Sequence, residues 1–202
     1  MSSKGRPRAF DVNQALDRAL EVFWSKGYEG TSLPDLTQAM GINRPSLYAA
    51  FGNKEALFRK VLDRYVEISS LATQEALNEP TSRAVAERLL FGSIELTTNP
   101  HHPRGCLLVL GGLAGGDAAE TMRQEMISRR QAGENAIRER FERAKTEGDL
   151  PDDADPADLA RFITTVNQGM SVQAGAGASR EELERVAKIA LHAWPKPKPP
   201  QP

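Results

Sequence analysis

Apolar residues recur at intervals of three and four along most of the chain, and this spacing limits the possible folds more than any other sequence feature. Such spacing gathers apolar side chains on one face of a helix, whereas a half-buried strand needs a strict alternation that the sequence does not sustain. With 40% apolar residues among 202, the chain can bury a core of ordinary size. We therefore predict an all-α globular protein.

Breaks between the helical stretches divide the chain into four parts. We expect a flexible basic arm at residues 1–10 and a disordered, proline-rich tail at residues 195–202. Between them lie an N-terminal helical domain, residues 11–62, and a larger helical domain, residues 63–194. Residues up to 64 carry ten basic and seven acidic side chains, whereas the remainder carries 16 and 20. This distribution fits a basic head on an acidic body.

The segment 32–51 is read as two short helices joined by a turn that contains glycine. Ser32 and Asp35 fit a capping box at the start of the first helix, and Gly41 ends that helix. Pro45 suits the first turn of the second helix. The arrangement is typical of a helix-turn-helix, whose second helix enters the major groove of DNA. It also occurs in helical proteins that bind no DNA.

The exposed side of the second helix carries groups that suit DNA. Arg44 can form two hydrogen bonds to a guanine edge, and Ser46 can bond a base or a phosphate. Tyr48 offers its hydroxyl to a phosphate and its ring to a thymine methyl. Lys54 lies at the start of the next helix, where both its ammonium and the helix N-terminus suit a phosphate.

The arm offers a second possible contact with DNA. Arg6 and Arg8 flank a proline, so this part of the arm is stiff and extended. Such a segment can lie in a narrow minor groove. The alternative is a solvated basic tail.

Three stretches, 27–36, 40–48 and 51–57, together resemble the N-terminal domain of the TetR/AcrR family. The motifs G-Y-x-G-T-S, L-Y-x-x-F and N-K-E-x-L carry this resemblance, which covers about residues 10–62. Residues 148–160 resemble the approach to the penultimate helix of many members more weakly. The resemblance implies a homodimeric transcription regulator, a repressor by default, that binds operator DNA and a small-molecule effector.

Carried over by position, the resemblance implies roles for individual residues. Arg44, Ser46 and Tyr48 face the operator, Pro45 also touches DNA, and Lys54 holds the phosphate backbone. The residues that precede the two helices complete the predicted set, namely Ser32 and Asn43. Ala49 and Ala50 stand where many members have bulky side chains, which leaves fewer groups for direct base readout.

The larger domain is expected to hold the effector and the dimer interface. The resemblance implies that the last two helices pair across a two-fold axis, as palindromic half-sites require. The predicted interface comprises Leu159, Ile163, Val166, Met170, Leu183, Val186, Ala190 and Trp194. Candidate effector contacts are Phe91, Cys106, Met122, Met126 and Phe162, although such apolar stripes more often form plain core.

Cys106 is the one cysteine of the chain, which excludes an intrachain disulfide and fits a cytoplasmic protein. It lies near a predicted helix start and beside Arg104. The thiol therefore suits either a sensor of oxidants and electrophiles or a small buried apolar residue. A metal site that combines it with His101 and His102 is disfavoured, because the two histidines would have to converge from a loop.

Other classes of protein find less support in the sequence. The motifs of serine hydrolases, P-loop and dinucleotide-binding enzymes and zinc enzymes do not occur, so we expect no catalysis, no cofactor and no metal. No apolar stretch reaches the length of a membrane span. A non-specific architectural DNA-binding protein remains the alternative, although it would be far more basic than a chain of net charge -1.

Overall fold

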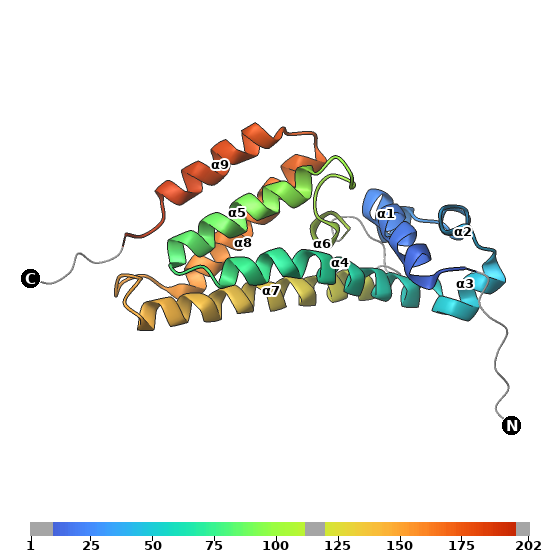
Figure 1. Cartoon of the computed structure of the whole chain (residues 1–202), viewed down its shortest axis with the longest axis horizontal. Coiled ribbons are helices and arrows are strands. Elements are labelled where there is room, and N and C mark those ends of the chain that lie inside the picture. The colour runs from blue at the N-terminus through green and yellow to red at the C-terminus, as the bar shows by residue number, and fades with distance from the viewer. Residues whose placement is uncertain (1–9, 112–119, 197–202) are drawn as a thin grey trace, which may run out of the picture.

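The computed structural model describes residues 10–111 and 120–196, and the regular elements within these ranges are helices (Figure 1). The all-α prediction is confirmed. In chain order the helices are α1 (Val12–Gly30), α2 (Leu33–Met40), α3 (Arg44–Phe51), α4 (Lys54–Leu77), α5 (Ser82–Thr98), α6 (Leu107–Leu110), α7 (Glu120–Thr146), α8 (Pro156–Gly175) and α9 (Arg180–His192).

Polar residues start several of these helices where the sequence predicts. The Asp11 carboxylate accepts the backbone N–H groups of Asn13 and Gln14 at 2.8 and 3.2 Å, which satisfies donors that have no partner inside the helix. Asp155 caps α8 in the same way. The backbone of α1 has a break at Gly27, with φ of 70°, and residues 28–30 add a further helical stretch.

The helices form a small head and a larger body (Figure 1). The head contains α1, α2 and α3. The long helix α4 begins beside α3, packs against α1, and continues into the body against α5 and α7. In the body, α8 packs against α5, α7 and α9. Because α4 belongs to both parts, a change in the body can reach the head through a single rigid element.

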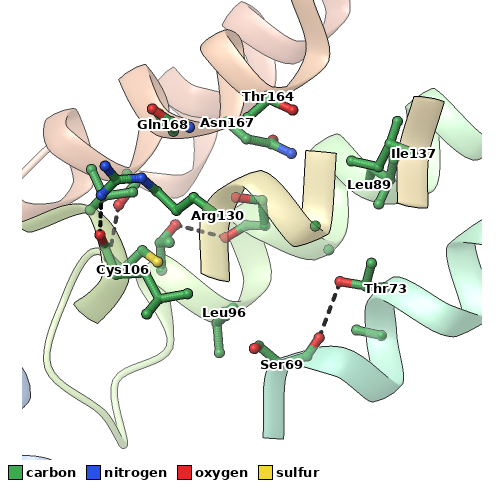
Figure 2. Close-up of a pocket in the computed structure, with 18 of the residues that line it drawn as sticks. Ser69, Thr73, Leu89, Leu96, Cys106, Arg130, Ile137, Thr164, Asn167 and Gln168 are labelled. Carbon is green, nitrogen blue, oxygen red and sulfur yellow. Dashed lines mark hydrogen bonds between the residues drawn. The ribbon is translucent and has the colours of Figure 1, made fainter. Parts of the chain in front are cut away.

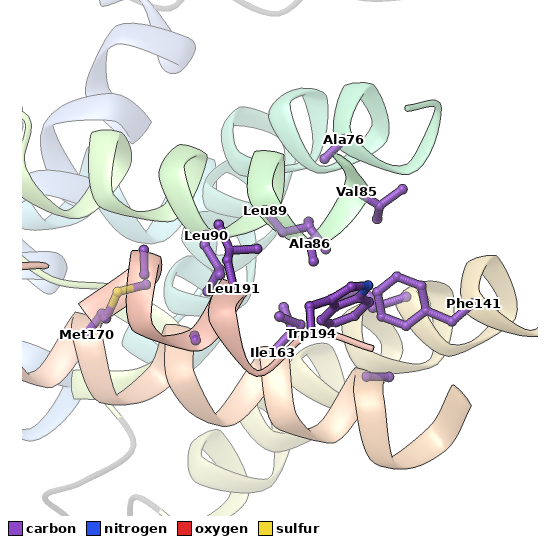
Figure 3. Packing of buried hydrophobic residues seen from close by; sticks show 14 of the residues in the cluster. Ala76, Val85, Ala86, Leu89, Leu90, Phe141, Ile163, Met170, Leu191 and Trp194 are labelled. Carbon is purple, nitrogen blue, oxygen red and sulfur yellow. The ribbon is translucent and has the colours of Figure 1, made fainter. Parts of the chain in front are cut away.

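Two hydrophobic cores hold the molecule together. One lies in the body, where the Trp194 ring packs 5.1 Å from the Phe141 ring between helices α7 and α9 (Figure 3). The other fills the head, and it also includes Leu107 of α6 and Met122 and Met126 of α7. The head core therefore extends beyond residue 62, the predicted boundary, into the body.

Two arginines, one buried and one exposed, tie the ends of body helices to their neighbours. Arg140, which is 5% exposed, donates to the carbonyl oxygens of Leu77 and Glu79 at 3.0 and 2.7 Å. Arg104 donates to the carbonyl oxygen of Ala174 at 3.0 Å, near the end of α8. The bonds to Leu77 and Glu79 satisfy carbonyl groups at the C-terminal end of α4. Arg104 adds a further donor to the Ala174 carbonyl oxygen, which already accepts the N–H of Gly177.

Candidate DNA-binding helices and effector cavity

The turn between α2 and α3 has the geometry of a helix-turn-helix. The Ser32 hydroxyl accepts the backbone N–H of Asp35 at 3.2 Å, while the Asp35 carboxylate accepts the N–H of Ser32 at 2.9 Å. Gly41 ends α2 in the left-handed region at φ of 67°, which glycine adopts without a steric cost. The Asn43 side chain then accepts the N–H of Ser46 at 2.9 Å and starts α3.

One side of each short helix is buried and the other is open. Leu36 and Met40 of α2 pack with Leu47 and Phe51 of α3 in the head core. This packing fixes the side of α3 that stays exposed. That side presents side chains predicted to meet DNA, and the exposed or half-buried members of the set are Ser32, Asn43, Arg44, Pro45, Ser46 and Tyr48. Arg6 and Arg8 lie outside the described residues.

The Lys54 side chain is more constrained than the sequence suggests. Its Nζ atom is 4.3 Å from the centre of the Tyr28 ring, a cation–π contact. Burial lowers the pKa of Lys54, and the nearby Glu29 carboxylate opposes that shift. The contact connects the start of α4 to the end of α1. A phosphate bound by Lys54 would therefore interact with a side chain that links both helices.

An ion pair joins α1 to α2. Lys26 Nζ lies 2.7 Å from Asp35 Oδ1, and the other oxygen of that carboxylate accepts the hydroxyl of Ser32 at 2.6 Å. The hydrogen bonds from Lys26 and then Ser32 hold the pKa of Asp35 well below its usual range. The carboxylate therefore stays charged at neutral pH and fixes α2 against α1.

A cavity of about 250 Å³ opens in the body between α4, α5, α7 and α8 (Figure 2). Most of its wall surface is apolar, although α4 and α5 contribute both apolar and polar side chains and the lining side chains of α8 are all polar. The lining residues are Ile68, Ser69, Ala72, Thr73, Arg88, Leu89, Gly92, Ser93, Leu96, Thr97, Cys106, Leu108, Val109, Arg130, Gly133, Glu134, Ile137, Thr164, Asn167, Gln168 and Ser171.

Of the five predicted effector contacts, one belongs to the lining of this cavity. Cys106 lines the cavity, whereas Met122 and Met126 are buried in the head core. Phe91 packs against the body core outside the lining, and Phe162 is 37% exposed on the surface of α8. Apolar spacing identifies the buried faces of helices, and these residues were assigned to a pocket on that signal alone.

The segment that precedes α6 links the cavity to the head. The Trp24 indole N–H of α1 donates to the carbonyl oxygen of Gly105 at 2.9 Å. One residue on, the backbone N–H of Cys106 donates to the Ser171 hydroxyl of α8 at 2.8 Å. The His102 ring stacks on Trp24 at 5.5 Å. A displacement of the cavity wall at Cys106 therefore pulls directly on α1.

The predicted dimer stripe lies largely inside one subunit, and its role in pairing stays a prediction. Most of its members lie in the core of their own subunit, either buried or packed against it: Leu159, Ile163, Val166, Met170, Leu183, Ala190 and Trp194. Val186 alone in the stripe is exposed, at 45%. The apolar side chains that α8 and α9 leave open are instead Phe162, Val172, Val186 and Ile189. The physical reason is that α8 and α9 are apolar on two faces. The face predicted to form the dimer interface packs against α5 within the subunit.

Comparison with known proteins matches both parts of the chain. Residues 15–61 match the model of bacterial regulatory proteins of the tetR family, and residues 87–190 match a tetracyclin repressor-like C-terminal domain. The chain is 38% identical to the HTH-type transcriptional repressor ComR of Escherichia coli K12, over 96% of this chain and 93% of ComR. The chain belongs to the TetR family.

Solved structures of TetR regulators agree. A cysteine mutant of the TetR family regulator CifR, complexed with a 26-base-pair operator DNA, is 44% identical with a TM-score of 0.91 and covers 94% of this chain and 100% of that one. A TetR regulator from Rhodococcus sp. RHA1 is 42% identical with a TM-score of 0.62, over 92% of this chain and all of that one. The protein is thus a transcriptional regulator that binds operator DNA as a homodimer and, as is typical of the TetR family, responds to a small molecule through its C-terminal domain.

Several cavity residues were missed by the sequence analysis, although a signal for them exists. Thr164, Asn167 and Ser171 follow one another at intervals of three and four in a helix that is otherwise largely apolar. Such spacing places polar side chains on one inner face.

Within the described residues no helix is long and apolar enough to cross a membrane, and no cluster of His, Cys, Asp and Glu suits a metal ion.

Proposed function

We propose that this TetR-family protein is a repressor that occupies its operator through α3 and leaves it when a small molecule enters the body cavity. The observation that carries the proposal is the pair of hydrogen bonds at residues 105 and 106, which join the cavity wall to α1 of the head. A ligand that changes this wall has a direct mechanical route to the DNA-binding helices. The coupling between the two sites is then a free energy that acts in both directions.

At the DNA, Arg44 is the principal base-reading residue in this proposal. It is exposed at the N-terminal end of α3, where recognition helices contact bases. Tyr48, 48% exposed one turn later, contacts the phosphate backbone or a thymine methyl. Ser32, Asn43, Pro45, Ser46 and Lys54 support phosphate contacts around it, and Arg6 and Arg8 of the arm add minor-groove contacts.

The dimer is proposed to form through α8 and α9. Phe162, Val172, Val186 and Ile189 are between 37% and 71% exposed, an unusual set of large apolar side chains to leave in water. A second copy of the chain buries them in an isologous interface, in which the same surface of each subunit takes part. Two recognition helices then meet two half-sites.

The head at residues 11–62 and the body at residues 63–194 are proposed as the functional division, with the arm and tail at either end. The head core includes Leu107 and Leu108 of α6 and Met122 and Met126 of α7, so we treat the two parts as one packed unit rather than as independent domains. We place the regulator in the cytoplasm, where bacterial operator DNA lies, and we assign it no catalytic activity.

Fluorescence anisotropy tests the proposed function. One labelled duplex carries the DNA that flanks the gene of this protein, and the other is a scrambled duplex of equal length at the same salt concentration. We expect roughly thousandfold tighter binding to the first duplex. Equally weak binding to both would contradict control of its own gene and favour an architectural role.

A second candidate mechanism follows from the position of Cys106. Its free thiol is partly exposed and lines the cavity. An electron-poor alkene that enters the cavity would form a carbon–sulfur bond to this thiol, and the thiol proton would end on the adjacent carbon. Such alkenes should release the wild type from its operator but not Cys106→Ser. Mass spectrometry should show the adduct on the wild type and not on the variant, and these two results together would establish the thiol mechanism. Unchanged release would exclude it.

A further inference from the structure

Two polar atoms at the cavity of the body have no partner. The Thr164 Oγ1 and Asn167 Oδ1 atoms are both buried, and neither has a hydrogen-bond partner among the described residues. Both residues line the cavity from α8 (Figure 2). A buried polar group without a partner destabilises the structure that holds it. A ligand that supplies the partner recovers the lost free energy, so the two atoms indicate where a polar group of the ligand lies.

The spacing of these two residues suits one small group. Thr164 and Asn167 are three positions apart on α8, so their side chains are neighbours on one face of the helix. The threonine hydroxyl can donate, and the Asn167 Oδ1 atom can accept. A single hydroxyl of a ligand satisfies both, because it accepts from Thr164 and donates to Asn167.

The charged groups at the cavity are already engaged. Arg88 forms an ion pair of 3.1 Å with Glu75, and the Glu134 carboxylate forms one of 2.6 Å with Arg161. The Arg130 guanidinium donates to the carbonyl oxygen of Leu108. A ligand ammonium would find the one lining carboxylate occupied. A ligand carboxylate would have to compete for Arg130 while Glu134, one turn along the same helix, repels it.

Most of the remaining wall surface is apolar, and the Ser69, Thr73 and Thr97 hydroxyls that also line it donate to backbone carbonyls of their own helices. Leu89, Leu96 and Ile137 face the cavity, and Gly92 leaves room for more ligand volume, because a Cβ atom placed there meets no heavy atom within 4 Å. Burial of an apolar ligand body against these side chains supplies the main binding free energy. The charged groups that line the cavity contribute little to a neutral ligand.

From these observations we infer that the effector cavity takes an uncharged, mainly apolar small molecule whose hydroxyl group bonds to Thr164 and Asn167. The inference rests on the proposed function, since it specifies the ligand of the same cavity. Thr164 and Asn167 then determine the ligand specificity through hydrogen bonds between uncharged groups rather than through charge.

Isothermal titration calorimetry with four matched probes tests the inference. Phenethyl alcohol, ethylbenzene, phenylacetate and phenethylammonium share one skeleton and differ in the terminal group. We expect phenethyl alcohol to bind at least about tenfold more tightly than either ion, because a buried ion without a partner is costly. Phenylacetate binding as tight as that of the alcohol, and lost in Arg130→Met, would overturn the inference in favour of an anion site.

Variants of the two polar residues provide the second test. In Asn167→Leu and in Thr164→Val we expect the affinity for phenethyl alcohol to fall about fivefold to tenfold, the equivalent of one net hydrogen bond. The affinity for ethylbenzene should stay within about twofold, since it makes no hydrogen bond. Equal changes for both probes would refute the role of these residues. The helical circular dichroism and Tm of each variant show that it is folded.

Gly92→Leu provides the control for the position of binding. The new side chain fills the cavity from α5, so binding of both neutral probes should be lost. Probe binding that persists in this variant, or no binding of either neutral probe to the wild type, would overturn the inference. Operator release is measured in parallel by anisotropy. Binding with the expected selectivity but without release would contradict the proposed function and leave the ligand assignment standing.

Discussion

Single polar side chains hold the DNA-contacting helix in place. Asn43 caps α3 and Ser32 caps α2, so each short helix has a defined first turn. Helices of eight residues are unstable on their own, and the caps together with Leu47 and Phe51 make up for this. The side chains that face DNA are therefore presented from a rigid support, and their individual contributions can be measured by substitution.

Arg44→Ala should reduce operator affinity about fivefold to a hundredfold, because a bidentate arginine–guanine contact contributes about 1–3 kcal/mol. Affinity for the scrambled duplex should fall much less. Arg143→Ala is the matched control, since it removes the same charge from the exposed C-terminal turn of α7, at the far end of the body. Anisotropy titrations compare the variants, and an equal loss on both duplexes would assign Arg44 to the phosphate backbone.

Asp35→Asn should lower the Tm of the protein at neutral pH, because it removes the ion pair with Lys26. The folded-state pKa of Asp35 lies below its unfolded value, near 3.9 for model peptides. Its stabilising contribution is therefore complete above that value and is lost as the pH falls toward the folded pKa. The Tm difference between wild type and variant, measured by circular dichroism, should be constant near neutrality and shrink in acid. A difference that grew in acid would contradict this assignment.

At the scale of elements, the short segment before α6 is the junction between cavity and head. It bonds to α1 through Gly105 and to α8 through Cys106, and the first turn of α6 belongs to the head core. Any shift of α8 on ligand binding moves the partner of the Trp24 indole. The segment therefore converts a change at the cavity into a change in the angle of α1.

Trp24→Phe should weaken this coupling while it keeps an aromatic ring beside Tyr65 and His102. The loss of one buried hydrogen bond, about 0.5–1.5 kcal/mol, should reduce the ligand-induced change in operator Kd by roughly twofold to tenfold. Operator titrations with and without saturating phenethyl alcohol measure it.

Trp194→Phe is the matched control for the coupling experiment. The Trp194 indole N–H has no partner among the residues that the structure describes, and its ring lies in the body core far from Gly105. This variant should lose stability without losing the ligand response. If it reduced the response as much as Trp24→Phe does, a general loosening of the protein would explain both results.

Helix positions could be predicted from the sequence better than the faces that helices use. Caps such as Asp11, Asn53 and Asp155 act locally, so their residue types suffice to place helix starts. The face of α8 that packs inside the subunit depends on contacts with α5, which lie about 70 residues away in sequence. For this reason Ile163 and Met170 were assigned to the dimer and Phe162 to the cavity, whereas the structure places the first two in the subunit core and Phe162 on the surface.

The candidate DNA site was easier to predict than the cavity. The residues proposed to face DNA follow from one short motif, in which Leu47 and Phe51 fix the buried side of α3 and leave Arg44 and Tyr48 on the other. The cavity is assembled from the five helices α4 to α8, and each contributes two or more residues. Thr164 and Asn167 can be recognised as cavity residues only in the folded structure, in which α5 and α7 form other walls of the cavity.

At the scale of the whole molecule, the exposed apolar face of α8 and α9 is the surface proposed to pair two copies of the chain. Ile189 is 71% exposed, the highest value among the large apolar residues that the structure describes. Side chains this exposed contribute little to the fold of a single subunit. Their energetic value lies in the pairing of two copies, and this pairing sets the distance between the recognition helices.

Ile189→Glu should therefore convert the dimer to monomers without unfolding the subunit. In the dimer the new carboxylates would be buried against a second apolar face, at a cost that exceeds the free energy of a surface substitution. Operator affinity should fall at least about a hundredfold, because each monomer reads one half-site and the advantage of linked binding is lost. Sedimentation velocity measures the assembly state, and anisotropy measures the operator affinity.

Leu71→Glu is the control: Leu71 is 65% exposed on α4, so this variant should remain a dimer. If Ile189→Glu stayed dimeric while Leu71→Glu dissociated, the interface would lie on α4, and the spacing of the two heads would have to be set by that helix instead.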